Sequence, residues 1–189
     1  MYLKKKYRGI WSYLKEAKNY FLVVFLLFIL SSLFGFLFPV FLREYIRRFV
    51  EDLLAKTKGM GFLELLTFIL QNNLYTAFMG MILGIAFGVL PLVYTFMNGY
   101  VIGYVSNAVV GEAGYRALLS LVPHGIFEIP ALILSLGLGL KLGMFVWAKE
   151  KKKQLLYDLR KSLEVFVFVI LPLLVIAAFI ETGLMFLIG

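Results

Sequence analysis

Cysteine is absent from this sequence of 189 residues, and histidine occurs once. Without cysteine the chain has no disulfide, no thiol nucleophile and no cysteine-ligated metal. Charged side chains make up only 16% of the residues, whereas soluble domains carry about 25%. The sequence also lacks a His-Glu-x-x-His helix, a phosphate-binding glycine loop and a nucleophile paired with a base. We therefore expect a protein that is not an enzyme and has no separate soluble domain of ordinary size.

Apolar residues dominate the composition: 62% of the chain is hydrophobic, 17% is aromatic and the mean hydropathy is +0.92. This predicts an all-α, polytopic transmembrane helix bundle that forms a single integral membrane domain over residues 1–189. Crossing a bilayer takes about 20 helical residues. Five apolar runs meet this length, at about 21–42, 74–97, 100–118, 127–147 and 165–187.

Polar and turn-forming residues separate these runs. Asn72 and Asn73 are expected to cap the second span, after an apolar run over 62–70 that is too short to cross. Asn98-Gly99 is a typical turn dipeptide, so we expect the chain to reverse there between the second and third spans.

Three segments outside the spans are strongly charged. Residues 43–58 repeat apolar side chains at helical spacing with charges on the other faces, which predicts an amphipathic interfacial helix. Residues 1–20 combine basic and aromatic side chains, which is typical of either an interfacial helix or a plain topology signal. Residues 149–161 are predicted to form a basic loop.

The distribution of basic residues predicts the orientation in the membrane. With the N-terminus inside, the cytoplasmic segments carry twelve Lys and Arg residues and the outer segments carry six. The positive-inside rule therefore favours a cytoplasmic N-terminus and an external C-terminus in a multi-pass cell-membrane protein. The net charge of +8 lies beside the apolar runs, so the expected partners are the bilayer and its anionic headgroups on the cytoplasmic face, and not nucleic acid.

Small residues recur at every fourth position on three of the predicted spans. This spacing lines one helix face and lets two helices approach closely in lipid. It predicts an inner bundle of the second, third and fourth spans with the first and fifth outside it. The contacts are expected either within one chain or between the chains of a homo-oligomer. The helix-packing positions are Gly80, Gly84, Gly88, Gly99, Gly103, Gly111, Ser135, Gly139 and Gly143.

The single histidine, His124, lies four residues before Glu128, so the two side chains would share one helix face. Pro123, Gly125 and Pro130 leave open whether this helix is continuous or broken near Pro130, and a broken helix in a membrane is tolerated where it is buried or lines a cavity. Counted by helical rise, two further carboxylates reach the same outer level. The predicted polar site is His124, Glu128, Glu112, Glu181, Asn72, Asn73, Asn98 and Asn107.

Three interpretations of His124 and Glu128 remain open at this point. They are a hydrogen-bonded pair that closes the outer end of the bundle, a divalent metal site and a proton or ion relay. In the metal interpretation both residues are ligands of zinc or iron and are joined by Glu112 or Glu181.

Several of these residues stand in a pattern that extends from about residue 20 to residue 185. It consists of the Asn-Asn pair before a glycine-rich span, Asn98-Gly99, and Pro123-His124-Gly125-x-x-Glu128-x-Pro130-Ala131. The pattern resembles the stage II sporulation protein M family of integral membrane proteins. In sporulating bacteria the resemblance implies a membrane component of an engulfment complex, working with stage II sporulation proteins D and P, which degrade peptidoglycan. Related proteins also occur in organisms that neither sporulate nor build peptidoglycan.

The main functional hypothesis is a non-enzymatic scaffold or anchor of a membrane complex, expected as a homo-oligomer with a membrane or cell-envelope protein as a further partner. Its expected contact surfaces are the charged segments 1–20, 43–58 and 149–161. One alternative is transport of an ion or small solute through an outer-leaflet polar pocket. A second alternative is a metal-binding membrane hydrolase at His124 and Glu128.

Overall fold

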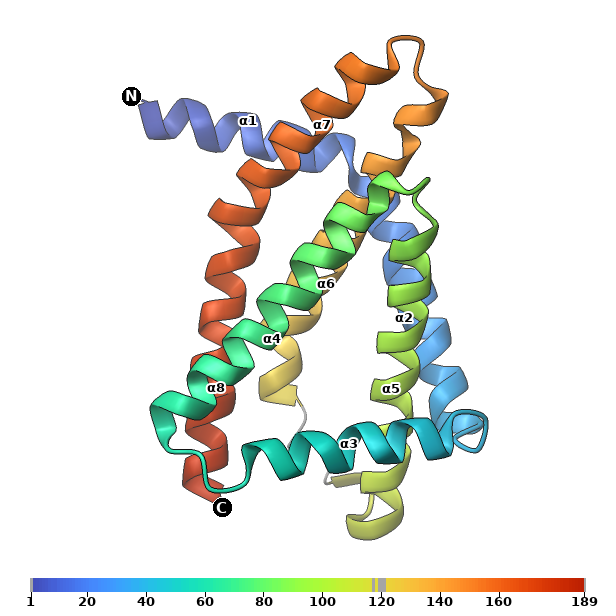
Figure 1. Cartoon of the computed structure of the whole chain (residues 1–189), viewed down its shortest axis with the longest axis vertical. Helices are drawn as coiled ribbons and strands as arrows, with labels where there is room; N and C mark the ends of the chain where they lie inside the picture. The colour runs from blue at the N-terminus through green and yellow to red at the C-terminus, as the bar shows by residue number, and fades with distance from the viewer. Residues whose placement is uncertain (1, 117, 119–121, 189) are drawn as a thin grey trace.

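The computed structural model describes residues 2–116, 118 and 122–188, and helices account for nearly all of them (Figure 1). No strand occurs in these ranges, which confirms the predicted all-α class. The α-helices are α1 (Tyr2–Glu16), α2 (Lys18–Leu37), α3 (Arg43–Thr57), α4 (Phe62–Ile82), α5 (Val89–Ala113), α6 (Val122–Gly143), α7 (Lys151–Val165) and α8 (Leu171–Ile188). Short 3-10 segments follow α4 (η1, Leu83–Ile85) and α6 (η3, Met144–Trp147), and a π-helical turn joins α7 to α8 (η4, Phe166–Ile170).

Five of the described helical segments are long and apolar enough to cross a membrane, as the composition predicts. They are Lys18–Leu37, Phe62–Ile85, Val89–Ala113, Gly125–Trp147 and Lys151–Leu187. The first and fourth lie close to their predicted positions, whereas the second and third are displaced along the chain.

The second span begins earlier than predicted, because α4 runs without interruption from Phe62. Glu64 accepts a hydrogen bond from the backbone N–H of Gly61 at 2.9 Å and thereby caps the start of this helix. Asn72 and Asn73 therefore lie in the middle of α4, and the prediction that they cap a helix is wrong. Asn72 is exposed and Asn73 is half-buried, so the pair interrupts the apolar composition without ending the helix.

The reversal between the second and third spans also differs from the prediction. It falls just after η1, where Phe87 and Gly88 both have positive φ angles, of 59° and 71°. This left-handed region is easy for glycine and rare for phenylalanine. Asn98-Gly99 lies within α5 and makes no turn, and the Asn98 side-chain amide donates a hydrogen bond to the Tyr94 carbonyl at 2.8 Å.

Proline does not break the later helices. α6 continues through Pro130, so of the two forms left open by the sequence the fourth span has the continuous one. Most of the predicted basic loop over 149–161 is helical as α7, which continues into α8. Before Pro172, which has no N–H to donate, the helix widens into η4, and the Leu171 N–H bonds to the Phe166 carbonyl.

Two helices lie across the ends of the bundle (Figure 1). α1 lies at the end that holds the N-terminus, and α3 lies at the opposite end, near the C-terminus. α3 confirms the amphipathic helix predicted over 43–58: Ile46 is fully buried, while ion pairs Arg47–Glu44 (3.0 Å) and Lys56–Asp52 (2.7 Å) occupy its exposed faces. The cytoplasmic location of the N-terminus stays a prediction.

α6 is the central helix of the bundle, because it packs against α2, α4, α5 and α8. Its buried residues Leu138 and Leu142 share one core with Ala77 and Met81 of α4 and with Leu174 of α8. α2 packs along α5. The prediction that the first and fifth spans lie outside an inner bundle is therefore wrong, since α2 and α8 each contact the central helix directly.

Candidate functional site

Polar side chains inside the spans tie neighbouring helices together through backbone carbonyls. Between α2 and α5, Ser32 donates to the Gly99 carbonyl and Asn107 donates to the Phe36 carbonyl, both at 3.0 Å. Between α6 and α4, Ser135 donates to the Ala77 carbonyl. Each of these bonds satisfies a polar group that lipid would leave unpaired at a cost.

The glycines of the predicted ladders lie at close helix contacts within this one chain. A Cβ at Gly103 would overlap the backbone of Ser32 on α2, and a Cβ at Gly84 would overlap the backbone of Gly139 on α6. Gly99 meets Ser31, Gly143 meets Gly88, and Gly80 meets the side chain of Leu136. Gly111 differs, because no described atom lies within 4 Å of a Cβ built there.

The predicted outer polar site is only partly assembled. Glu128 on α6 and Glu181 on α8 are half-buried, each has one buried carboxylate oxygen, and their helices pack together. Glu112 is instead exposed at the end of α5, which stops at Ala113. Asn98 and Asn107 make the local and interhelical bonds already described, away from any shared site.

The metal interpretation depends on the side chain of His124, which lies outside the part of the chain that the structure describes. The backbone of His124 belongs to the first turn of α6. Among the described side chains, no group of three or more His, Asp or Glu residues could hold a metal ion. The zinc site at His124 and Glu128 therefore stays a prediction.

A buried polar cluster that the sequence reasoning missed lies at the other end of the bundle. It joins α1, α6 and α7 around Asp158, which is 2% exposed. The Lys141 ammonium lies 3.5 Å from Asp158 Oδ1, 3.4 Å from Glu16 Oε2 and 3.8 Å from the centre of the Tyr13 ring. Lys141 is 8% exposed, so it is held inside the protein rather than reaching out to the headgroups as a snorkelling lysine would.

Hydrogen bonds complete this cluster. The Tyr13 hydroxyl donates to Asp158 Oδ1 at 2.9 Å and lies 3.2 Å from the Ser162 hydroxyl. Gln154 donates to Asp158 Oδ2 at 2.7 Å. Burial raises the pKa of the Tyr13 phenol well above its usual range, so the hydroxyl stays protonated and continues to donate.

The sequence does hold a weak signal for the cluster. Gln154, Asp158 and Ser162 are spaced four apart and so share one face of α7. Lys141, within an apolar run, was the other hint. Nothing in the sequence indicates that α1 folds back to bring Tyr13 to these residues.

The five apolar helical segments found in the described part of the chain, with amphipathic helices across the ends of the bundle, define a polytopic α-helical membrane protein. Residues 19–184 match the family model described as Stage II sporulation protein M, and the chain belongs to this family.

Two curated relatives come from Methanocaldococcus jannaschii. The uncharacterized protein MJ0793 is 32% identical over 119 residues, which cover 60% of this chain and 66% of the relative. The uncharacterized protein MJ0706 is 30% identical over 186 residues, which cover 89% of this chain and 82% of the relative. The chain thus spans just under two thirds of the first relative's length. No solved structure matches the chain.

Proposed function

We propose that this stage II sporulation protein M family member is a non-enzymatic scaffold or anchor of a membrane complex. The observation that carries the proposal is the use of its intramembrane polar groups. Ser32, Asn107 and Ser135 bond to carbonyls of neighbouring helices, and glycines bring the same helices into backbone contact. Such bonds stabilise the association of the helices, whereas a solute pathway needs polar groups that face the solute.

The proposed contact surface is α3. It lies across one end of the bundle and presents exposed aromatic side chains, Tyr45 at 62% and Phe49 at 45%, beside its ion-paired charges. Exposed aromatic residues among charged ones are typical of protein contact surfaces. A second copy of this chain or another membrane protein would bind at this surface.

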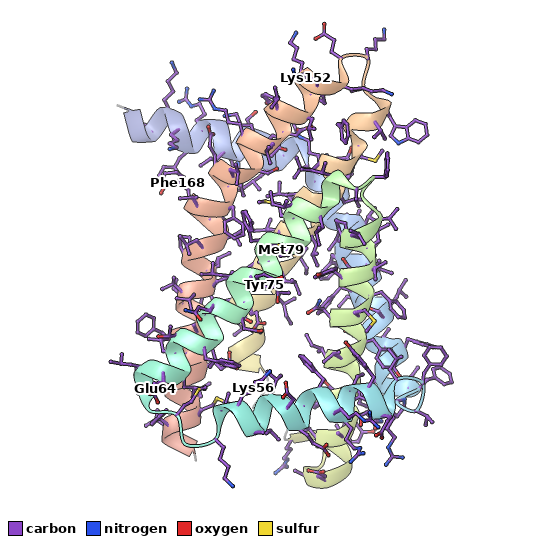
Figure 2. All side chains as sticks on the ribbon, in the orientation of Figure 1. Lys56, Glu64, Tyr75, Met79, Lys152 and Phe168 are labelled. Atoms are coloured by element: carbon purple, nitrogen blue, oxygen red, sulfur yellow. The ribbon has the colours of Figure 1, made fainter. Side chains whose placement is uncertain are left out.

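The absence of cysteine from the sequence makes a direct test simple. A single cysteine at Tyr45 should form a discrete crosslinked species in native membranes, identified by its mass. The control cysteine replaces Tyr75, which is 65% exposed and lies in the middle of α4, away from the end of the bundle that α3 crosses (Figure 2). If each of the two single-cysteine variants folds normally and neither forms a crosslinked species, the scaffold role is refuted.

A second candidate function is proton or ion movement across the membrane. It rests on Glu128 and Glu181, which place buried carboxylate oxygens on two contacting spans. Carboxylates within membrane spans are costly and commonly functional. Flux into proteoliposomes should then fall with Glu128→Gln and persist with the control Glu112→Gln, which changes an exposed residue at the end of α5. Equal flux through the wild-type chain, Glu128→Gln and Glu112→Gln would reject this candidate.

A further inference from the structure

An open groove of about 490 Å³ follows one side of α7 and η4. Its walls are apolar and spaced along a single helical stripe: Leu156, Leu159, Leu163, Val167 and Phe168. Two of these side chains are accessible, Leu156 at 56% and Val167 at 49% exposed. Arg160 and Glu164 complete the lining.

Basic side chains stand around this groove. Lys6 of α1 places its ammonium 3.9 Å from the centre of the Phe168 ring. Arg160 and Lys161 lie 3.5 Å and 2.9 Å from the carboxylate of Glu164. Three cations thus face one carboxylate, which leaves a net of two positive charges. The side chain of Arg160 is 82% exposed and can reach an added anion.

The depth of the groove follows from the length of its helix. Lys151–Leu187 is a continuous segment of 37 residues, about 55 Å at 1.5 Å per residue, whereas the hydrocarbon core is about 30 Å thick. About 20 residues counted back from Leu187 end near Phe168. Figure 2 shows Phe168 directly below α1, the amphipathic helix that crosses this end of the bundle. By this count Phe168 lies at the level at which the helix leaves the hydrocarbon, and the other lining residues follow it on the side away from the hydrocarbon.

We propose that this groove is a binding site for one anionic phospholipid. The headgroup phosphate would contact Lys6, Arg160 and Lys161, and an acyl chain would lie against Val167 and Phe168. The argument is complementarity: Val167 and Phe168 lie nearest the bilayer, with Arg160 and Lys161 further out on the same helix, and this order of apolar and basic side chains matches an anionic lipid in both charge and polarity. The site goes beyond the scaffold role, since a scaffold needs no specific lipid.

Native mass spectrometry of the delipidated full chain in neutral detergent tests the site. The probes are phosphatidylglycerol and phosphatidylcholine with identical acyl chains. Phosphatidylglycerol should bind as a single adduct, and more tightly than phosphatidylcholine. Lys6→Gln combined with Arg160→Gln should weaken its binding about tenfold, because each basic group near a lipid surface contributes to anion attraction.

The matched control is Lys152→Gln combined with Lys153→Gln. It removes the same two charges from exposed positions at the far end of α7 (Figure 2) and should leave phosphatidylglycerol binding nearly unchanged. Glycerol phosphate, which has no acyl chain, should fail to displace the lipid. The proposal is overturned if both variants lose binding equally, if phosphatidylcholine binds as tightly, or if the groove variant changes only the oligomeric mass. None of these readouts depends on a partner protein, so the scaffold role can fail independently.

Discussion

Lys141→Met removes the cation from the buried cluster and leaves Asp158, which is 2% exposed, without its ion pair. Breaking a buried pair by deleting one partner typically costs about 3–5 kcal/mol. Hydrogen bonds from Tyr13 and Gln154 would still reach Asp158, so we expect the lower end of this range, about 3 kcal/mol.

The double variant Lys141→Met with Asp158→Leu should recover most of this loss. It removes both charges and fills the site with apolar side chains, and apolar replacement of a whole buried pair is often neutral. The Tyr13 hydroxyl keeps two acceptors, the backbone carbonyl at 158 and the Ser162 hydroxyl, both at 3.2 Å. We therefore expect the double variant to be less destabilised than the sum of the two single variants, by at least about 2 kcal/mol.

The assay is reversible unfolding of the purified chain in mixed detergent micelles containing increasing SDS, with each variant compared at the same protein concentration. Lys153→Met is the matched control, because it breaks an exposed pair with Glu150 at 2.8 Å and should cost less than about 1 kcal/mol. Strictly additive single variants, or a Lys141→Met loss no larger than that of the control, would refute the reasoning that Lys141 and Asp158 form a coupled buried pair.

Three further outcomes are expected. Gly103→Ala should destabilise the fold by about 1–3 kcal/mol in the same assay because its Cβ overlaps α2, whereas Gly111→Ala meets open space and should not. The raised Tyr13 pKa predicts stability that is complete below the unfolded pKa of about 10 and falls as pH rises towards the folded pKa; Tyr13→Phe should remove that part of the fall in alkaline unfolding titrations. The zinc hypothesis requires a near-stoichiometric metal, measured by elemental mass spectrometry, that disappears in His124→Ala. It is rejected if neither chain holds metal and the wild-type and His124→Ala chains are equally stable.

Local composition was sufficient for the elements that lipid and water select directly. The existence of the apolar spans and of the amphipathic α3 follows from residue type and spacing, since each depends on contact with solvent or bilayer. The family resemblance over nearly the whole chain was likewise readable from short polar motifs, and residues 19–184 match the family.

The reversal between the second and third spans required the tertiary structure. Asn98-Gly99 carries the stronger local turn signal, yet Gly99 packs against Ser31 and belongs to a continuous helix. The chain turns at Phe87 and Gly88 instead, where Gly143 of α6 approaches closely. Helix packing outweighed turn propensity here, because each helix gains many contacts from staying straight along its neighbour.

Residue composition and periodicity were enough to predict an all-α membrane protein with apolar spans and an amphipathic helix over 43–58. The tertiary structure alone decided which helix is central and which polar residues meet. Tyr13, Lys141 and Asp158 are up to 145 residues apart in the chain, yet they form one buried cluster. Helical periodicity relates residues within about two turns, whereas pairings between distant helices depend on how all the helix surfaces fit together.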